Sequence, residues 1–256
     1  MLLAIDIGNT NIAVGCFDGK DLKAEVRLTT HSGRTLDEYE VLLASTIERR
    51  VPGSKIARCI ISSVVPPITQ DIAAVVERAF GIEPLVVGPG IRTGIQLKVP
   101  DPSSVGADRV VNSVAARHLY GTPALVVDFG TATTFDVVNE DGDYEGGIIA
   151  PGVKIALEAL VSRTAKLPRI ELSWPKTVVG KGTVAAMQSG AVIGYLCLVE
   201  GLIARIIEER GPIPHLICTG GLGRVFTEHS RVLEKYDPYL TLHGMRIISE
   251  LNERPV

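Results

Sequence analysis

Aspartate, glycine and threonine recur at matching places in the two halves of the sequence, in a pattern that suits a phosphate-binding turn. The first copy, Asp6–Asn11, joins two short apolar runs, and the second copy, Asp128–Thr134, does the same near the middle of the chain. A glycine turn lets backbone N–H groups approach an anion closely, and carboxylates suit hard cations or bound water. We expect hydroxyl donors from Thr10, Thr131, Thr133 and Thr134.

One Asp-x-Gly-x-Thr turn is a weak signal, because such turns are also purely structural. Two copies at equivalent places in two halves favour a nucleotide site, with the hairpins facing each other around a polyphosphate and its metal ion. The common alternatives, the G-x-x-x-x-G-K-[ST] and G-x-G-x-x-G motifs, are absent from the sequence. The segment Thr219–Gly223 follows an apolar run; it either borders the adenosine end of a nucleotide or is a plain strand-to-helix turn.

Two further segments rich in small residues are candidates for the functional site. Val105–Arg109 precedes a helical stretch, where Asp and Arg at a helix start suit an anion or a polar substrate. The alternative is N-terminal capping by Asp108 with a solvated Arg109. Gly146–Gly152 holds glycines and a proline close together, which predicts a tight loop, functional or structural, before a helix that begins near Val153.

The elements that must position these residues alternate between strands and helices, which indicates an α/β fold. The restart of the pattern near residue 120 predicts two similar halves, residues 1–117 and 118–256. Apolar runs predict strands at Leu2–Asp6, Ile12–Phe17, Ala57–Val65, Leu85–Val87, Ala124–Asp128, Phe135–Asn139 and His215–Cys218. Helical patterns fall at Tyr39–Arg50, Ile68–Phe80, Val110–Leu119, Lys154–Ala165 and Ala185–Arg210.

Composition narrows the class of protein. The 256 residues are 46% hydrophobic and carry a net charge of −3, so a nucleic-acid partner is not expected. The four cysteines stand among apolar neighbours and predict buried free thiols in a reducing, cytoplasmic compartment. The uncharged stretch Gly182–Val199 approaches the length of a membrane span, but its polar residues and glycines favour a buried core helix and no membrane partner.

The ordered set of motifs resembles type III pantothenate kinase, in the actin, hexokinase and acetate kinase superfamily. The matching segments span nearly the whole chain: Asp6–Asn11, Ile61–Pro66, Val105–Arg109, Asp128–Thr134, Gly146–Gly152, Thr219–Gly221 and Pro238–Met245. The resemblance implies two ribonuclease-H-like halves, each a mixed sheet flanked by helices, with an ATP cleft between them. It also implies phosphorylation of pantothenate by ATP with Mg²⁺ and a monovalent cation (K⁺ or NH₄⁺), in a homodimer whose pantothenate site lies at the dimer interface.

Site roles follow from this resemblance residue by residue. Asp108 is the implied proton acceptor, Asp128 the ligand of the monovalent cation, and Arg109 a candidate partner for the substrate carboxylate. The implied ATP-binding residues are Asp6, Ile7, Gly8, Asn9, Thr10, Asn11, Ile12, Ala13 and Thr131. The implied pantothenate-binding residues are Gly106, Ala107, Asp108, Arg109 and Thr183.

One position departs from the family pattern. Members often carry Tyr-x-x-Pro shortly before Val-Gly-Ala-Asp-Arg, and here Val99 stands in place of the tyrosine. A hydroxyl and a ring are lost beside the expected pantothenate pocket. Two alternatives therefore stay open: a non-catalytic regulatory relative, and a kinase of a related hydroxy acid or sugar.

Overall fold

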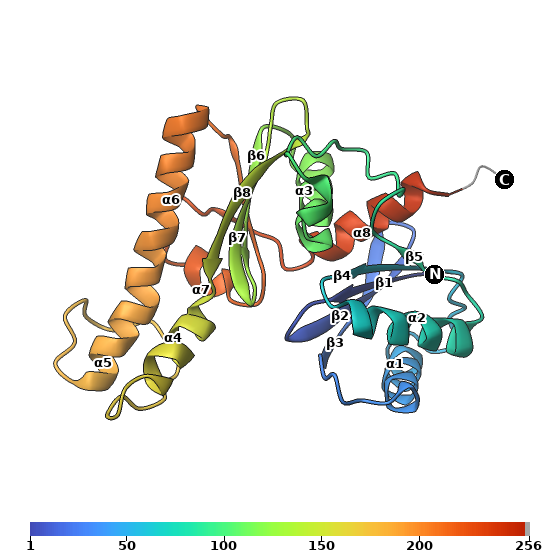
Figure 1. Cartoon of the computed structure of the whole chain (residues 1–256), viewed down its shortest axis with the longest axis horizontal. Coiled ribbons are helices and arrows are strands. Elements are labelled where there is room, and N and C mark those ends of the chain that lie inside the picture. Colours follow the sequence, from blue (N-terminus) through green and yellow to red (C-terminus); the bar gives the residue numbers. More distant parts are fainter. Residues whose placement is uncertain (254–256) are drawn as a thin grey trace. The chain divides into compact units, whose positions relative to one another are not determined.

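The computed structural model describes residues 1–253 and shows two compact units (Figure 1). Unit 1 comprises Met1–Leu119 together with the segment from Tyr239 onward, and unit 2 comprises Tyr120–Pro238. The division expected from the sequence, between residues 117 and 118, differs from this grouping because it left the C-terminal segment in the second half. As a statement about separately folding domains, that division stays a prediction.

Unit 1 is built on a five-stranded mixed sheet. Its strands are β1 (Leu2–Ile7), β2 (Asn11–Asp18), β3 (Asp21–Thr29), β4 (Arg58–Ser63) and β5 (Leu85–Val86), in the order β3-β2-β1-β4-β5. The first three strands pair antiparallel, and β4 and β5 continue the sheet in parallel with β1. This register places the polar end of β1 directly beside the polar end of β4.

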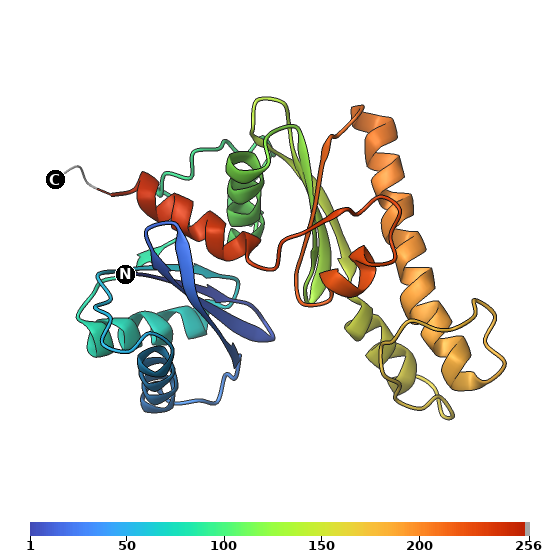
Figure 2. The same ribbon diagram turned by 180° about the vertical axis from the view of Figure 1, so that it is seen from behind.

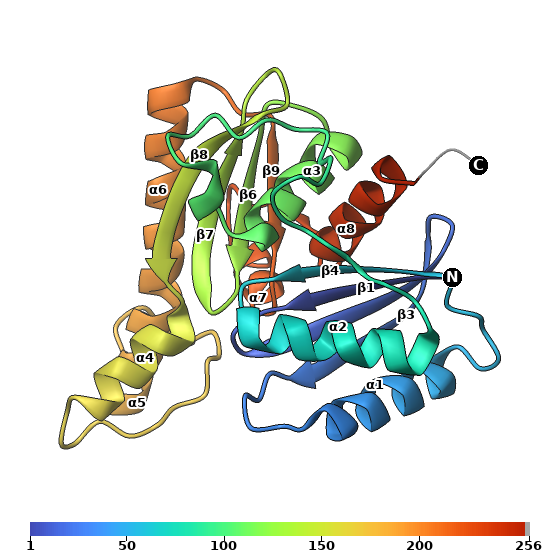
Figure 3. The same ribbon diagram turned by 45° about the vertical axis from the view of Figure 1, so that its right-hand side comes forward.

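Helices cover both faces of this sheet. Helices α1 (Leu36–Arg50) and α2 (Pro66–Phe80) lie on one face, and α3 (Ala107–Leu119) and α8 (Leu240–Leu251) lie on the other (Figure 3). Side chains alternate along β1, so Leu3, Ile5 and Ile7 pack toward α1 and α2. The face toward α3 and α8 receives Leu2 and Ala4, and by the same alternation Asp6.

The helix ends follow local sequence signals. Thr35 caps α1 in a capping box, since its hydroxyl accepts from the Glu38 N–H while the Glu38 carboxylate accepts from the Thr35 N–H. Helix α2 starts at Pro66-Pro67, which need no N–H partner, and stops at Gly81 in the left-handed conformation. The strand prediction Ala57–Val65 and the two helix predictions are confirmed within three residues at each end.

Unit 2 repeats the same connectivity. Its strands are β6 (Ala124–Phe129), β7 (Ala132–Val138), β8 (Tyr144–Pro151), β9 (His215–Thr219) and β10 (Lys235–Tyr236), in the order β10-β9-β6-β7-β8. Strand β6 corresponds to β1, with an antiparallel partner on one side and a parallel partner on the other. The prediction of two similar α/β halves, each a mixed sheet flanked by helices, is confirmed.

One face of the unit 2 sheet packs against helices that follow β8 and β9. These are α4 (Val153–Ser162), the π-helical segment η2 (Ser189–Gly194), α6 (Tyr195–Arg210) and α7 (Gly223–Thr227), and the short helix α5 (Thr183–Gln188) leads into η2. Figure 2 shows α6 running along the sheet. Phe129 and Phe135 from the sheet meet Val199, Ile203 and Phe226 from the helices in one buried cluster.

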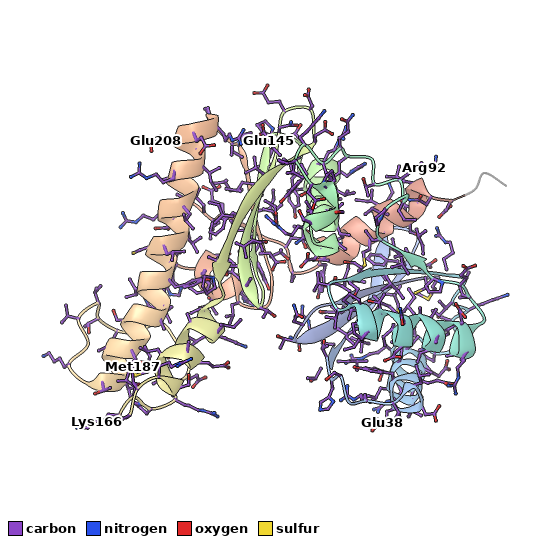
Figure 4. All side chains as sticks on the ribbon, in the orientation of Figure 1. Glu38, Arg92, Glu145, Lys166, Met187 and Glu208 are labelled. Carbon is purple, nitrogen blue, oxygen red and sulfur yellow. The ribbon has the colours of Figure 1, made fainter. Side chains whose placement is uncertain are left out.

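The helix from α5 through η2 to α6 is long and apolar enough, by composition, to cross a membrane. Figure 4 marks its two ends with Met187 and Glu208. One side packs into the unit 2 core through Val199 and Ile203, and Glu200 accepts a hydrogen bond from Ser230 Oγ at 2.8 Å. The sequence predicted a buried core helix. Since 33% of its most apolar stretch is buried, the helix packs into the core along one side and leaves the other side exposed.

Two local expectations were wrong. The segment Gly146–Gly152 is not a tight loop: most of it forms β8, which pairs with β7 along its length. Glycine runs favour loops in isolation, but here the partner strand supplies the hydrogen bonds that fix the chain. Of the four cysteines, Cys197 is exposed on α6, whereas the others are buried, and burial raises the pKa of Cys218 to about 12.

Candidate active site

The turn between β1 and β2 is tight because Gly8 bonds back across it. The Gly8 N–H donates to the Asn11 carbonyl oxygen at 3.0 Å, and a Cβ atom on Gly8 would lie 3.2 Å from that oxygen. Residues Asn9–Asn11 are exposed, whereas the side chains of Ile7 and Ile12 are fully buried in the core. A ligand at this turn can reach the two isoleucines only through their backbone.

Thr30, directly after β3, holds this turn in place, a role that the sequence analysis did not predict. Its N–H donates to the Thr10 carbonyl oxygen at 3.0 Å, and its hydroxyl donates to the Gly8 carbonyl oxygen at 2.7 Å. Both bonds use carbonyl groups of the turn, so Thr30 holds the turn through its backbone oxygens. The only sequence signal is a threonine at the end of the strand that pairs with β2.

Asp108 lies in the first turn of α3, inside the helix rather than at its cap position. Its Oδ1 accepts from the Arg109 N–H at 2.8 Å. Gly106 is close by, because a Cβ atom there would lie 2.6 Å from Oδ1 and 3.6 Å from Val64 Cγ1. Burial raises the pKa of the Asp108 carboxyl, while the Arg109 N–H and guanidinium oppose that shift.

Asp6 has a buried hydroxyl beside it. Asp6 and Ser62 are direct partners in the parallel pairing of β1 with β4, so both side chains project to the α3 face of the sheet. Ser62 is fully buried, and within the described residues its Oγ has no hydrogen-bond partner. A buried hydroxyl left in this state normally bonds to water or a ligand. The contact of Gly106 with Val64 brings the start of α3 to the same end of β4.

In unit 2, the corresponding carboxylate is enclosed by glycines. Asp128 is the partner of Thr219 in the pairing of β6 with β9, and the chain then turns at Gly220 with φ +87°. A Cβ atom on Gly220 would collide with Asp128 Oδ1 and would lie 2.6 Å from the Phe129 carbonyl oxygen. One on Gly130 would lie 3.6 Å from the same Oδ1. The Thr219–Gly221 segment is thus a close packing partner of the second turn.

The second turn exposes fewer hydroxyl groups than the sequence predicted. Thr131 is exposed at its tip. Thr133 is buried, and its hydroxyl lies 2.7 Å from the Tyr195 hydroxyl. The Thr134 hydroxyl donates to the buried Asp136 carboxylate at 3.0 Å. Of the three threonines, Thr131 alone has the exposure that a ligand contact needs, so the expectation for Thr133 was wrong.

Thr183 begins α5 in the same unit and is exposed. The preceding Gly180 packs closely on the helix, since a Cβ atom there would lie 2.5 Å from the Ala185 carbonyl carbon. The predicted site residues therefore group by unit. Asp6–Ala13 and Gly106–Arg109 belong to unit 1, and Asp128, Thr131 and Thr183 belong to unit 2.

Among residues 1–253, no group of three or more His, Cys, Asp or Glu side chains is arranged to hold a metal ion. Asp6 and Asp128 are single carboxylates beside glycine turns. This is the arrangement expected for Mg²⁺, which binds one or two carboxylates and completes its shell with water and substrate phosphates. The residues present therefore fit a metal that arrives with a nucleotide.

Unit 2 also contains a cavity of about 880 Å³. Helix α4 forms one wall through Lys154 and Glu158, and the segment Arg169–Leu172 forms another. Leu222, directly after the Thr219–Gly221 segment, completes the lining. The cavity thus opens beside the loop that packs on Asp128.

Solved structures share this fold at low sequence identity. A Campylobacter jejuni protein assigned to the Baf family of transcriptional activators is 19% identical over 98% of both chains, with a TM-score of 0.61. The ethanolamine utilization protein EutJ of Carboxydothermus hydrogenoformans is 16% identical over 96% of this chain and 89% of its own, with a TM-score of 0.58. The inorganic polyphosphate/ATP-glucomannokinase of Arthrobacter sp. strain KM is 16% identical over 98% and 97%, with a TM-score of 0.50.

These likenesses show the fold, and the family follows from the sequence. The sequence model of type III pantothenate kinase matches residues 2–205, from β1 into α6. The matched range contains both turns, the start of α3 with Asp108, and Thr183. The chain therefore belongs to the type III pantothenate kinase family, whose members transfer a phosphoryl group from ATP to an alcohol group of pantothenate.

Proposed function

We propose that this chain converts pantothenate and ATP to 4′-phosphopantothenate and ADP, the first step of coenzyme A synthesis, with Asp108 as the proton acceptor. The assignment of Asp108 rests on one observation. Its carboxylate lies at the start of α3, where burial raises its pKa. A base with a raised pKa holds the transferred proton more strongly than an ordinary carboxylate does. Asp108 is therefore better suited to the role than an exposed aspartate.

The reaction needs one proton transfer and one phosphoryl transfer. The primary hydroxyl oxygen of pantothenate forms a bond to the γ-phosphorus as the bond from that phosphorus to the β–γ bridging oxygen breaks. The hydroxyl proton passes to Asp108, and ADP leaves. Because phosphoryl transfer depends on positioning and charge neutralisation, the protein contributes mainly oriented donors and cations.

Asp6–Ala13 line the ATP phosphates in this proposal, and Thr131 also contacts ATP. The exposure of Asn9–Asn11 at the first turn supports the former, and the exposure of Thr131 supports the latter. Ser62 is an additional candidate, because its buried hydroxyl can donate to water held by Asp6. Mg²⁺, bound with the nucleotide, would offset the phosphate charge.

Asp128 is the proposed ligand of a monovalent cation, K⁺ or NH₄⁺. Its Oδ1 lies close to both Gly130 and Gly220, and the Phe129 carbonyl oxygen also lies beside Gly220. Oxygen ligands of this kind suit a hard cation. Omission of K⁺ and NH₄⁺ from the assay is expected to lower turnover in the wild type and to have little effect in an Asp128→Asn variant.

Gly106–Arg109 form the proposed pantothenate contacts, and Arg109 pairs with the substrate carboxylate. A guanidinium matches a carboxylate through two parallel hydrogen bonds, which fixes its orientation. Val99 lies in the segment that leads to this loop and has neither hydroxyl nor ring. Reintroducing the family side chain with Val99→Tyr is expected to lower the KM for pantothenate.

The nucleoside end of ATP is proposed to occupy the unit 2 cavity. The cavity is lined mainly by aliphatic side chains of α4 and Leu222, with Lys154, Glu158 and Arg169 at its walls. This gives the Thr219–Gly221 segment the adenosine-bordering role that the sequence left open. Leu222→Arg, which fills the cavity, is expected to raise the KM for ATP and leave the KM for pantothenate unchanged.

A homodimer is proposed, with the exposed side of the α5–η2–α6 helix as the contact between copies. Val178 and Val179, just before α5, are 66% and 80% exposed, and Leu198 on α6 is also exposed. Large exposed apolar side chains along a helix favour burial against a partner. Thr183 begins this helix, so a second copy docked on the helix would lie near it. Sedimentation of the wild type as a monomer at assay concentrations would remove this part of the proposal.

Cytoplasmic location and the absence of nucleic-acid and membrane partners stay predictions. Three buried free thiols and the net charge of −3 support them. They do not bear on the catalytic assignment.

Mass spectrometry of reaction mixtures tests the function. Purified protein with ATP, Mg²⁺ and K⁺ is given pantothenate, a set of other hydroxy acids, or a set of sugars. Of these candidate substrates, we expect only pantothenate to give a phosphorylated product. Product from another member of the panel would support the related-kinase alternative and direct attention to Val99, and ATP binding without any product would support the regulatory alternative.

A further inference from the structure

Tyr195 makes a buried polar connection that the chemistry above does not use. It is the first residue of α6, and its hydroxyl lies 2.7 Å from Thr133 Oγ1 and 2.8 Å from the Pro151 carbonyl oxygen. A carbonyl oxygen can only accept, so the tyrosine donates its one hydrogen to Pro151 and accepts from the threonine hydroxyl. Burial raises the pKa of Tyr195, which keeps the hydroxyl protonated.

Both partners adjoin the second phosphate-binding turn. Thr133 is two residues after Thr131, near the start of β7. Pro151 ends β8 and is followed by Gly152, which packs on the turn: a Cβ atom there would lie 2.9 Å from the Thr131 carbonyl carbon and 3.0 Å from the Gly130 carbonyl oxygen. The Tyr195 hydroxyl therefore fixes the strand that leaves the turn and the strand end that packs against it.

The helix preceding Tyr195 is shaped in an unusual way. The π-helical segment η2, Ser189–Gly194, ends directly before it, and Ser189 Oγ donates to the Val178 carbonyl oxygen. Each extra residue rotates the following side chains by about 100° around a helix axis. The π-helical segment therefore sets the side of α6 on which Tyr195 lies, and such segments are frequent at functional sites.

We propose that Tyr195 is a positioning residue for ATP binding, acting through the Gly130–Thr131 turn. The inference rests on the proposed function in the assignment of Thr131 to ATP. The aromatic ring is held independently of the hydroxyl, since it packs at 5.5 Å from the Phe226 ring, which stacks on Phe129 at 4.7 Å. Removal of the hydroxyl alone thus leaves the core packing in place.

The test is Tyr195→Phe, compared with Tyr120→Phe as a matched control. Tyr120 is in the same unit, and its hydroxyl donates to Asp237 at 3.0 Å rather than to the strands around the turn. We expect Tyr195→Phe to raise the KM and the Kd for ATP by about three- to tenfold, the effect of losing one or two neutral hydrogen bonds. The KM for pantothenate should stay at the wild-type value, and Tyr120→Phe should change neither KM.

A second variant makes the result specific to the hydrogen-bonded pair. Thr133→Val keeps the branched shape and removes the other hydroxyl, so it should raise the KM for ATP in the same way. The KM for ATP of the double variant should be no higher than that of either single variant, because the two hydroxyl groups act as one unit. Additive effects of the two changes would contradict the proposal.

A merely structural role gives a different pattern. In that case Tyr195→Phe lowers Tm and either leaves both KM values unchanged or raises both together, and either pattern overturns the inference. Failure of the proposed function is distinguishable, because wild-type protein would then form no 4′-phosphopantothenate while the Kd for ATP could still be compared between the variants by titration calorimetry.

Discussion

The two units build the same turn and hold it in different ways. In each unit the turn follows the central strand, β1 or β6, and the strand two places along the sheet, β3 or β8, ends beside it. Unit 1 continues from β3 into Thr30, whose N–H and hydroxyl bond to carbonyl groups of the turn. Unit 2 continues from β8 into Gly152, whose backbone lies directly against Gly130 and Thr131.

This difference shows that one backbone geometry can be supported by opposite residue types. At the Thr30 position the side chain supplies a hydrogen bond, whereas at the Gly152 position any side chain would collide with the turn. The polar support in unit 2 comes instead from Tyr195 on a distant helix. Asp108 belongs to unit 1, so we expect its replacement to alter turnover, whereas loss of the Tyr195 support in unit 2 should alter ATP affinity.

The largest expected effect is on turnover. Asp108→Asn should lower kcat by about 10²- to 10⁴-fold, the usual contribution of a general base, while ATP binding stays at the wild-type level. Asp101→Asn is the matched control, since Asp101 is an exposed aspartate of the same unit that caps the short helix at Pro102–Ser104. Steady-state kinetics of both variants separate the two residues, and near-normal kcat in Asp108→Asn would remove it from the mechanism.

The second-largest expected effect is on the free energy of unfolding, through the close contact of Gly152 with the unit 2 turn. Gly152 has φ −63° and ψ 151°, a conformation that alanine adopts freely, so Gly152→Ala tests the contact alone. We expect the free energy of unfolding to fall by about 1–3 kcal/mol, as for other overpacked sites. Gly88→Ala is the control, because nothing lies within 4 Å of a Cβ atom there. Equal denaturation midpoints for the two variants would contradict the contact as described.

The smallest expected effect is also on the free energy of unfolding, through the hydrogen bond of Thr30 to the unit 1 turn. Thr30→Val removes the bond to the Gly8 carbonyl oxygen and should lower the free energy of unfolding by about 1 kcal/mol. Thr30→Ser retains a hydroxyl and should recover most of that loss. Urea denaturation of the pair measures the difference. A valine variant as stable as the serine variant would show that the backbone bond to Thr10 holds the turn without help.

Local signals were sufficient to predict much of the fold. Apolar runs predicted β1, β4, β6 and β9, and helical patterns predicted α1 and α2, although their starts at the Thr35 capping box and at Pro66 lie two or three residues before the predicted ones. The repeated turn predicted the two similar halves, because the chemistry that recurs lies within a few consecutive residues. The resemblance to pantothenate kinases rested on the same short segments and was confirmed by the family match.

Features that depend on contacts between distant segments were not predicted. The glycines of β8 indicated a loop until pairing with β7 fixed them as a strand. The return of α8 to unit 1 has no local signal, since it depends on Leu242 and Met245 packing against β1, β4 and α3. Thr30 and Tyr195 become meaningful only when the sheet and the helix bring them to their turns.

The pH dependence of 4′-phosphopantothenate formation tests the central claim most directly. Asp108 must be ionised to accept a proton, and burial raises its pKa, so the rate should fall on the acid side at a pH above the ordinary aspartate value of 3.8. That acid limb should be absent from the residual activity of Asp108→Asn. A wild-type rate that stays level down to the ordinary aspartate range, or the same limb in the variant, would contradict the role of Asp108.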